Sequence, residues 1–265
     1  MKYKIGWFSS GRDKAARDLL ETVYKHIQNG KLQGMEISFV FSNRDKGEDK
    51  ESDKFFELVK CFKIPLITFP WREFKTALRK EDIKEWRRLY DKEIIKRIDK
   101  FKVSLIMLAG YMLVVGQEMC QKYSLVNLHP AVPGGPKGTW QEVIWELIKR
   151  KTKKTGAMIH LVTPELDKGP PLTYCTFSLR GEKFDSLWIK MEKKLKKKSL
   201  EKIQKEEGER EPLFREIRKE ELAREFPLII YTLKAFSMGA IDLEKRPFIK
   251  PFCLNKKIRC NNETG

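Results

Sequence analysis

Three polar side chains whose types suit acyl transfer stand at the ends of two strand-like segments. Asn127 and His129 flank Leu128 in NLHPAVPGGPKGTW, residues 127 to 140, and Asp167 lies in the turn TPELDKGPP, residues 163 to 171. An amide can hold a developing oxyanion, an imidazole can move a proton or stabilise charge, and a carboxylate can orient a water or the imidazole. Neither stretch contains serine or cysteine, so the nucleophile would come from the substrate.

The position of the first pair follows from strand geometry. Side chains alternate between the two faces of a strand, so Asn127 and His129 project to the same side. Pro130 has no N–H for a central sheet, so the strand ends there. Ligands bind at the carboxyl ends of strands in open parallel sheets. An alternative stays open for these two residues alone, in which Asn127 caps the loop and His129 is a satisfied, partly buried histidine.

The elements that must position these side chains alternate between strand and helix. Such a pattern is typical of an α/β protein with a mostly parallel sheet. We expect strands at residues 3–10, 35–43, 65–69, 103–110, 124–130, 156–163 and 171–179. We expect helices at residues 13–27, 53–62, 81–100, 115–123 and 140–150. The strand at 103–110 is the most apolar, and we expect it to be central.

The chain from residue 184 onwards reads as helical, with breaks at Gly208 and Pro212 and an apolar stretch at 226–236. The last thirty residues show no clear period. We therefore expect two parts, an α/β domain at 1–183 and a helical C-terminal extension at 184–265 that packs on the same domain.

A formal charge of +18 raises the question of a nucleic-acid partner. The densest stretch is residues 190–205, with eight lysines against two glutamates. Phe184, Leu187, Trp188 and Met191 recur at helical spacing beside it, which predicts an amphipathic helix with a solvated lysine face. We favour this interpretation over RNA binding.

Targeting and redox signals are absent. No apolar run approaches the roughly 18 to 20 residues that span a bilayer, and the N-terminus enters a strand-like pattern at once. We expect a soluble, cytoplasmic protein. The five cysteines are scattered, without a CxxC pair, which predicts neither a disulfide framework nor a metal site.

Three blocks of the chain resemble the signature blocks of the folate-dependent formyltransferases. They are LAGYMLVV (108–115), NLHPAVPGGPKG (127–138) and TGAMIHLVTPELDKGP (155–170), and FVFSNRDKG (39–47) matches the second strand and following loop of that family. The similarity covers roughly residues 3 to 180. It implies a Rossmann-like sheet and transfer of a formyl group from 10-formyltetrahydrofolate, as co-substrate and without a metal, to an amine. It also implies the keywords one-carbon metabolism and purine biosynthesis.

The resemblance assigns roles to residues at matching positions. Asn127, His129 and Asp167 would be the catalytic trio, the first two stabilising the reacting centre and the last assisting proton transfer. Two loops would embrace the pterin, the first through its backbone. These cofactor-binding residues would be Met112, Leu113, Val114, Val115, Val162, Thr163 and Glu165.

The departures from the family fall on the acceptor side. A Gly-x-Gly-Ser-Asn loop that holds the substrate phosphate in the family is replaced by SSGRDKAARDLL, residues 9–20. The loop still opens a helix, and Ser10, Gly11 and Arg12 could bind an anion. Leu222 stands where the family has a substrate-binding glutamate, with Glu221 beside it. Residues 190–212 look like an insertion.

We therefore expect a formyltransferase that acts on a small amine, phosphorylated or anionic, such as glycinamide ribonucleotide. Two alternatives stay open. One is a non-catalytic folate- or nucleotide-binding module of the same fold, and the other is formylation of aminoacyl-tRNA. We expect neither a membrane nor a nucleic-acid partner, and a homodimer is left open.

Overall fold

The computed structural model describes residues 2–243 and 250–259. Its strands follow the order β3-β2-β1-β4-β5-β6-β7-β8 in a mostly parallel sheet. The predicted α/β class with a mostly parallel, Rossmann-like sheet is confirmed, and β4, the strand predicted to be central, lies inside the sheet.

The described residues form two compact units. The first unit takes its residues from Met1–Leu128, His160–Pro170 and Ile229–Ile249, and the second from His129–Ile159, Pro171–Leu228 and Lys250–Gly265. These limits do not coincide with the boundary expected near residue 183, which stays a prediction.

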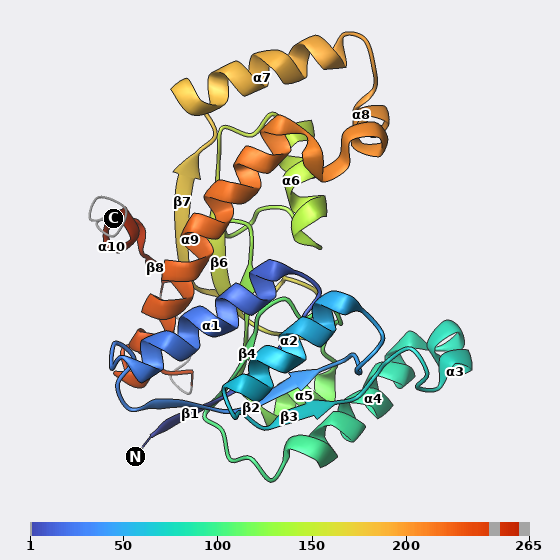
Figure 1. Cartoon of the computed structure of the whole chain (residues 1–265), viewed down its shortest axis with the longest axis vertical. Helices are drawn as coiled ribbons and strands as arrows, with labels where there is room; N and C mark the ends of the chain where they lie inside the picture. Colours follow the sequence, from blue (N-terminus) through green and yellow to red (C-terminus); the bar gives the residue numbers. More distant parts are fainter. Residues whose placement is uncertain (1, 244–249, 260–265) are drawn as a thin grey trace. The chain divides into compact units, whose positions relative to one another are not determined.

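The first unit contains the strands and helices of the N-terminal half. They are β1 (Tyr3–Phe8), α1 (Lys14–Gln28), β2 (Met35–Ser42), α2 (Lys50–Cys61), β3 (Leu66–Thr68), α3 (Thr76–Glu81), α4 (Ile83–Ile98), β4 (Leu105–Leu108), α5 (Gln117–Lys122) and the start of β5 (Leu125–His129). Each has an expected counterpart except α3. Helices α1 and α2 lie side by side on one face of these strands, while α4 and α5 lie on the other (Figure 1).

Apolar side chains on both faces of these strands explain this layering. Phe8, Phe39 and Ile106 lie on the face that packs against α4 and α5. Gly6 lies on the same face, and it has no side chain because the Phe39 ring takes the space. A Cβ at Gly6 would lie 2.6 Å from Phe39 Cζ and 3.2 Å from Ile106 Cγ1.

The second unit contains most of the remaining elements. They are α6 (Trp140–Lys149), β6 (Lys154–Leu161), β7 (Pro171–Ser178), α7 (Glu182–Leu195), α8 (Leu200–Glu207), the short 3₁₀ turn η1 (Gly208–Arg210), the first part of α9 (Pro212–Ser237), β8 (Phe252–Cys253) and α10 (Asn255–Arg259). The helical C-terminal region is confirmed, including the break between Gly208 and Pro212. The sequence did not predict β8 or α10, and Cys260 lies outside the described residues.

The second unit has its own apolar core. Trp145, Trp188, Met191 and Phe214 are buried in it, with contributions from α6, α7, α8 and α9. The apolar side of α7 is therefore covered, as its helical spacing predicts. Among residues 2–243 and 250–259, no helix combines the length and apolar character needed to cross a membrane.

The close approach at Gly6 gives a first prediction. Gly6→Ala should lower the free energy of unfolding by about 1 to 3 kcal/mol, because the new methyl group overpacks the core against Phe39. Urea titration followed by circular dichroism measures this loss. Combining Gly6→Ala with Phe39→Leu should recover part of it. Equal urea midpoints for wild type and Gly6→Ala would contradict the packing.

Candidate functional site

The carboxyl end of β5 carries the first of the predicted site residues. Asn127 is half-buried there, between the buried Val126 and Leu128, as alternation along the strand predicts. Its side-chain nitrogen Nδ2 lies 3.1 Å from Nε2 of His160, which is near the end of β6. Sequence reasoning did not select His160 as a site residue.

The protonation of His160 follows from its other contact. Nδ1 lies 2.9 Å from the carbonyl oxygen of Leu161, and a carbonyl can only accept a hydrogen bond. Nδ1 therefore carries a hydrogen, and in the neutral ring Nε2 presents a lone pair that accepts from the Asn127 amide. His160 is 3% exposed, so this arrangement is shielded from water.

Asp167 also lies beside His160. Its Oδ1 lies 3.6 Å from Nε2 of His160, and its side chain is buried. Asp167 has a φ of +49°, a left-handed conformation that costs free energy for a residue other than glycine. The predicted residues Asn127 and Asp167 are thus brought together through His160 in the first unit. A proton taken by Nε2 would be stabilised by the carboxylate.

The turn between β6 and β7 holds Asp167 in place. The N–H of Leu161 donates to the carbonyl of Pro170, so the two ends of the turn are joined. Gly169 has no room for a side chain, since a Cβ there would lie 1.6 Å from the Leu161 oxygen. The N–H of Val162 donates to Leu125 of β5, which fixes the start of the turn beside the strand of Asn127.

His129, the third member of the predicted trio, belongs to the second unit. It is 2% exposed, and its Nε2 lies 2.8 Å from the carbonyl oxygen of Pro136 in the loop that follows β5. Nε2 is therefore the protonated nitrogen, because it must donate to that carbonyl. The loop ends at Thr139, which caps α6 in a reciprocal pair with Glu142.

The first predicted cofactor loop combines buried side chains with an open backbone. The Val115 side chain is buried and Leu113 packs against the same core, whereas Met112 is exposed. Within the described part of the chain, the N–H groups of Leu113, Val114 and Val115 donate no hydrogen bond to another residue. A ligand that accepts hydrogen bonds fits such a backbone.

The second predicted cofactor loop, Val162 to Asp167, lies in the same unit. Val162 packs against the core cluster that Leu113 also contacts, and Leu166 is exposed. The Thr163 hydroxyl donates to the Glu165 carbonyl, which shapes the turn. The two loops therefore share one supporting core, and each offers an exposed apolar side chain, Met112 or Leu166, to a flat apolar ligand.

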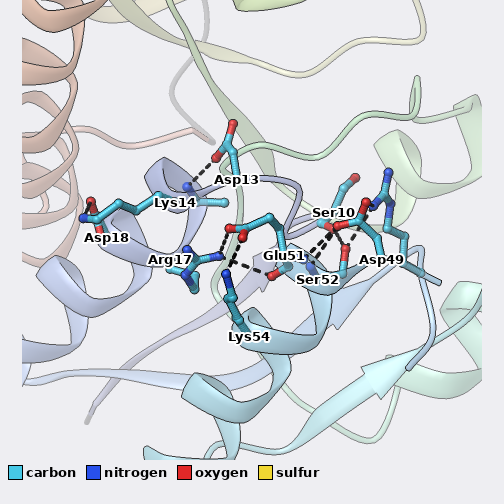
Figure 2. A network of polar contacts seen from close by, with 11 residues as sticks. Ser10, Asp13, Lys14, Arg17, Asp18, Asp49, Glu51, Ser52 and Lys54 are labelled. Carbon is cyan, nitrogen blue, oxygen red and sulfur yellow. Dashed lines mark hydrogen bonds and ion pairs between the residues drawn. The ribbon is translucent and has the colours of Figure 1, made fainter. Parts of the chain in front are cut away.

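The predicted substrate loop is dominated by internal contacts of Ser10. Its hydroxyl donates to Asn43 Oδ1 at 2.7 Å and accepts from the N–H of Met112 at 3.0 Å. Its backbone carbonyl accepts from the Ser52 hydroxyl (Figure 2). Ser10 thus joins the loop after β1 to the ends of β2 and β4, and its side chain is fully buried. In the same loop Gly11 has a φ of +60°, and Arg12 is exposed.

A carboxylate occupies the start of α1. Asp13 is the N-cap, and its Oδ1 accepts from the N–H of Ala16 at 2.9 Å. The neighbouring charges are also paired, since Arg17 contacts Glu51, which in turn contacts Lys54 (Figure 2). The chain itself therefore supplies an acceptor for one of the free N–H groups at this helix end.

The buried carboxylate of Asp91 holds the segment that directly follows the first predicted cofactor loop. Asp91 of α4 accepts from the N–H of Met119 and that of Gly116, which is the N-cap of α5. Burial raises the pKa of Asp91 to about 6, although the two N–H groups act in the opposite direction. No group of three or more metal-ligating side chains occurs among the residues that the structure describes.

Comparisons with known proteins indicate the family to which the chain is similar. Residues 4–179 match the family model described as formyl transferase. The chain is 33% identical over 138 residues to phosphoribosylglycinamide formyltransferase of Saccharomyces cerevisiae, a match that covers 49% of this chain and 62% of the relative. It is 36% identical over 93 residues to the enzyme of the same name from Schizosaccharomyces pombe, covering 32% and 45%. The chain thus spans about half the length of these curated relatives.

A solved structure shows the same fold. Glycinamide ribonucleotide transformylase 1 from Symbiobacterium toebii superposes with a TM-score of 0.66 at 17% identity, and the match covers 92% of each chain.

The buried Asp91 carboxyl predicts a pH effect on stability. Its folded pKa of about 6 lies above the ordinary value of 3.8, so its contribution is fully present below pH 4 and is lost as the pH rises through about 6. Compared with Asp91→Asn, wild type should lose up to about 3 kcal/mol of unfolding free energy across this window. Urea titrations at several pH values measure the difference.

A control for Asp91 is Asp99→Asn, since the ion pair with Lys122 lowers the pKa of Asp99. Relative to Asp99→Asn, wild type should lose unfolding free energy as the pH falls below about 4, and the difference should stay constant between about pH 4 and 6. A pH-independent difference between wild type and Asp91→Asn would contradict the assignment.

The Asp13 cap at the start of α1 predicts a low affinity of the loop at residues 9–13 for anions. Asp13→Ser should keep the cap and remove its charge, so orthophosphate should bind about tenfold more tightly than to wild type. Calorimetry measures this. Asp82→Ser removes the equivalent carboxylate from the start of α4 and reports the effect at an ordinary helix end. An equal gain in both variants would show that Ser10, Gly11 and Arg12 add no anion affinity.

Proposed function

Because the chain belongs to the formyl transferase family, we propose that it transfers a formyl group from 10-formyltetrahydrofolate to the amine of a small acceptor, glycinamide ribonucleotide or a related amine. The series of contacts from the half-buried Asn127 through the buried His160 to Asp167 is the observation that carries the proposal. It joins an amide donor, a proton acceptor and a carboxylate, which formyl transfer to an amine needs.

The two cofactor loops fit a folate. Its pterin ring is flat and carries hydrogen-bond acceptors, which suits the N–H groups of Leu113, Val114 and Val115 and the exposed Met112 and Leu166. When bound, 10-formyltetrahydrofolate supplies an activated formyl group. The residues of the chain must then orient the two reactants, stabilise negative charge and hold a proton.

Asn127 suits the stabilisation of negative charge. One N–H of its amide faces Nε2 of His160, and the other makes no hydrogen bond to a residue that the structure describes. This second N–H would donate to the oxygen on which charge develops. His129, with its Nε2 hydrogen held by Pro136, would support the same centre as the family resemblance implies.

His160 and Asp167 suit proton transfer. Once the Asn127 amide releases it, Nε2 of His160 would accept the proton that the attacking amine loses, because the hydrogen on Nδ1 leaves Nε2 as the nitrogen with the lone pair. Asp167 would stabilise the resulting positive charge at a distance of 3.6 Å. The pair would then return the proton to the departing nitrogen of the folate.

The proposal is tested by formyl transfer from 10-formyltetrahydrofolate to glycinamide ribonucleotide and to other amines. His160→Ala and Asp167→Asn should each lower kcat by about 10²- to 10⁴-fold, with folate binding retained. His26→Ala is the matched control, because His26 also bonds a backbone carbonyl, that of Thr22, but lies on α1.

Two outcomes would overturn the proposal. Wild type could fail both to bind a folate and to consume the formyl donor with any amine. Alternatively, His160→Ala and Asp167→Asn could transfer formyl groups at the wild-type rate.

A further inference from the structure

A groove of about 650 Å³ opens on the second unit, where the sequence predicted only packed helices. It is lined by the first residue of α6, by α7, by η1 and by the first three turns of α9. Its apolar lining includes Trp140, Leu187, Pro212 and Leu222, with the buried Phe214 beneath. The volume lies in the range of small-molecule sites.

The walls of the groove are fixed by polar contacts. Gln141 donates to Glu209, which joins α6 to η1, and Lys183 pairs with Glu216 at 2.8 Å, which joins α7 to α9. A ligand would therefore meet a preformed groove, and little conformational entropy would be lost on binding.

Arg218 is also fixed, and its charge is compensated. Its guanidinium lies over the Trp140 ring at 4.5 Å and contacts Glu225 at 2.8 Å. Glu221 lies 3.6 Å from the same guanidinium, and burial raises the pKa of Glu221 well above its usual range. Glu225 is thus the carboxylate that neutralises the charge of Arg218. Arg218, stacked on Trp140, then forms part of the groove wall without a free positive charge.

Two other cations of the groove lack a balancing carboxylate. Arg215 and Lys219 are exposed, and neither contacts an acidic side chain within residues 2–243 and 250–259. They are four residues apart on α9, so they share one face of the helix and repel each other. A bound anion would relieve this repulsion.

We propose that this groove binds a nucleoside monophosphate, with the phosphate on Arg215 and Lys219 and the base against Trp140, Leu187 and Leu222. The base, the ribose and the phosphate of such a nucleotide would each contact groove residues. The exposed Glu209 carboxylate can accept a hydrogen bond from a ribose hydroxyl. The site lies within the second unit and is independent of the proposed formyl transfer.

The test is calorimetric titration of the full chain with the four ribonucleoside monophosphates, beside adenosine and orthophosphate. At least one nucleotide should bind ten times or more tightly than adenosine or orthophosphate. The double variant Arg215→Ala with Lys219→Ala should weaken this binding at least tenfold. The matched control is Lys190→Ala with Lys193→Ala, two exposed lysines of α7 outside the groove, which should change it less than twofold.

Trp140→Ala should weaken nucleotide binding, because it removes the ring against which the base packs. Circular dichroism verifies that each variant is folded. If Trp140→Ala does not fold, Leu187→Ser serves the same purpose. Absence of binding by all four nucleotides, or equal weakening by the control and groove variants, would overturn the proposal.

Discussion

One hydrogen bond, from Nδ1 of His160 to the carbonyl of Leu161, determines which imidazole nitrogen faces Asn127 and Asp167 with a lone pair. It places the ring hydrogen on the side away from Asn127 and Asp167, so the nitrogen that faces them is a base. The bond depends in turn on the tight turn behind it. Gly169 lies against the same Leu161 oxygen, and a larger residue there would push the turn away. The chemistry of the imidazole therefore rests on a glycine that bears no functional group.

The neighbouring loops are held by a second polar connection, centred on Ser10. The Ser10 hydroxyl, which the sequence assigned to anion binding, joins the ends of three strands that are far apart in the sequence. The loop before α1 is thereby coupled to the loop that contains Met112. The loop predicted to bind the acceptor and the loop predicted to bind the cofactor are therefore held by the same side chain, which would help to align two substrates.

Much of the fold could be predicted, because apolar periodicity reports directly on burial. Alternation along β5 and the proline after His129 indicated where Asn127 would lie. The turn chemistry around Asp167 indicated the second residue. His160 was missed, although it is a buried polar residue in the otherwise apolar strand GAMIHL, which is a usable signal.

Other features could not be predicted, since they depend on distant partners. The engagement of Ser10 requires Asn43, which is 33 residues away. The groove on the second unit combines residues from four separate elements, none of which carries a motif. The elements β8 and α10 are too short to show a period, and Lys75, whose positive φ precedes α3, gives no compositional sign of a helix start.

The Asp13 cap has a consequence for the conditions under which the loop before α1 meets its ligand. A carboxylate attached to the helix it caps behaves as a permanently present competitor, with an effective concentration of about millimolar or higher. Free orthophosphate and other small cellular anions must compete with a group that never diffuses away. Occupancy of the loop by small anions should therefore change little with their concentration. Only a ligand held by additional contacts elsewhere would displace the carboxylate.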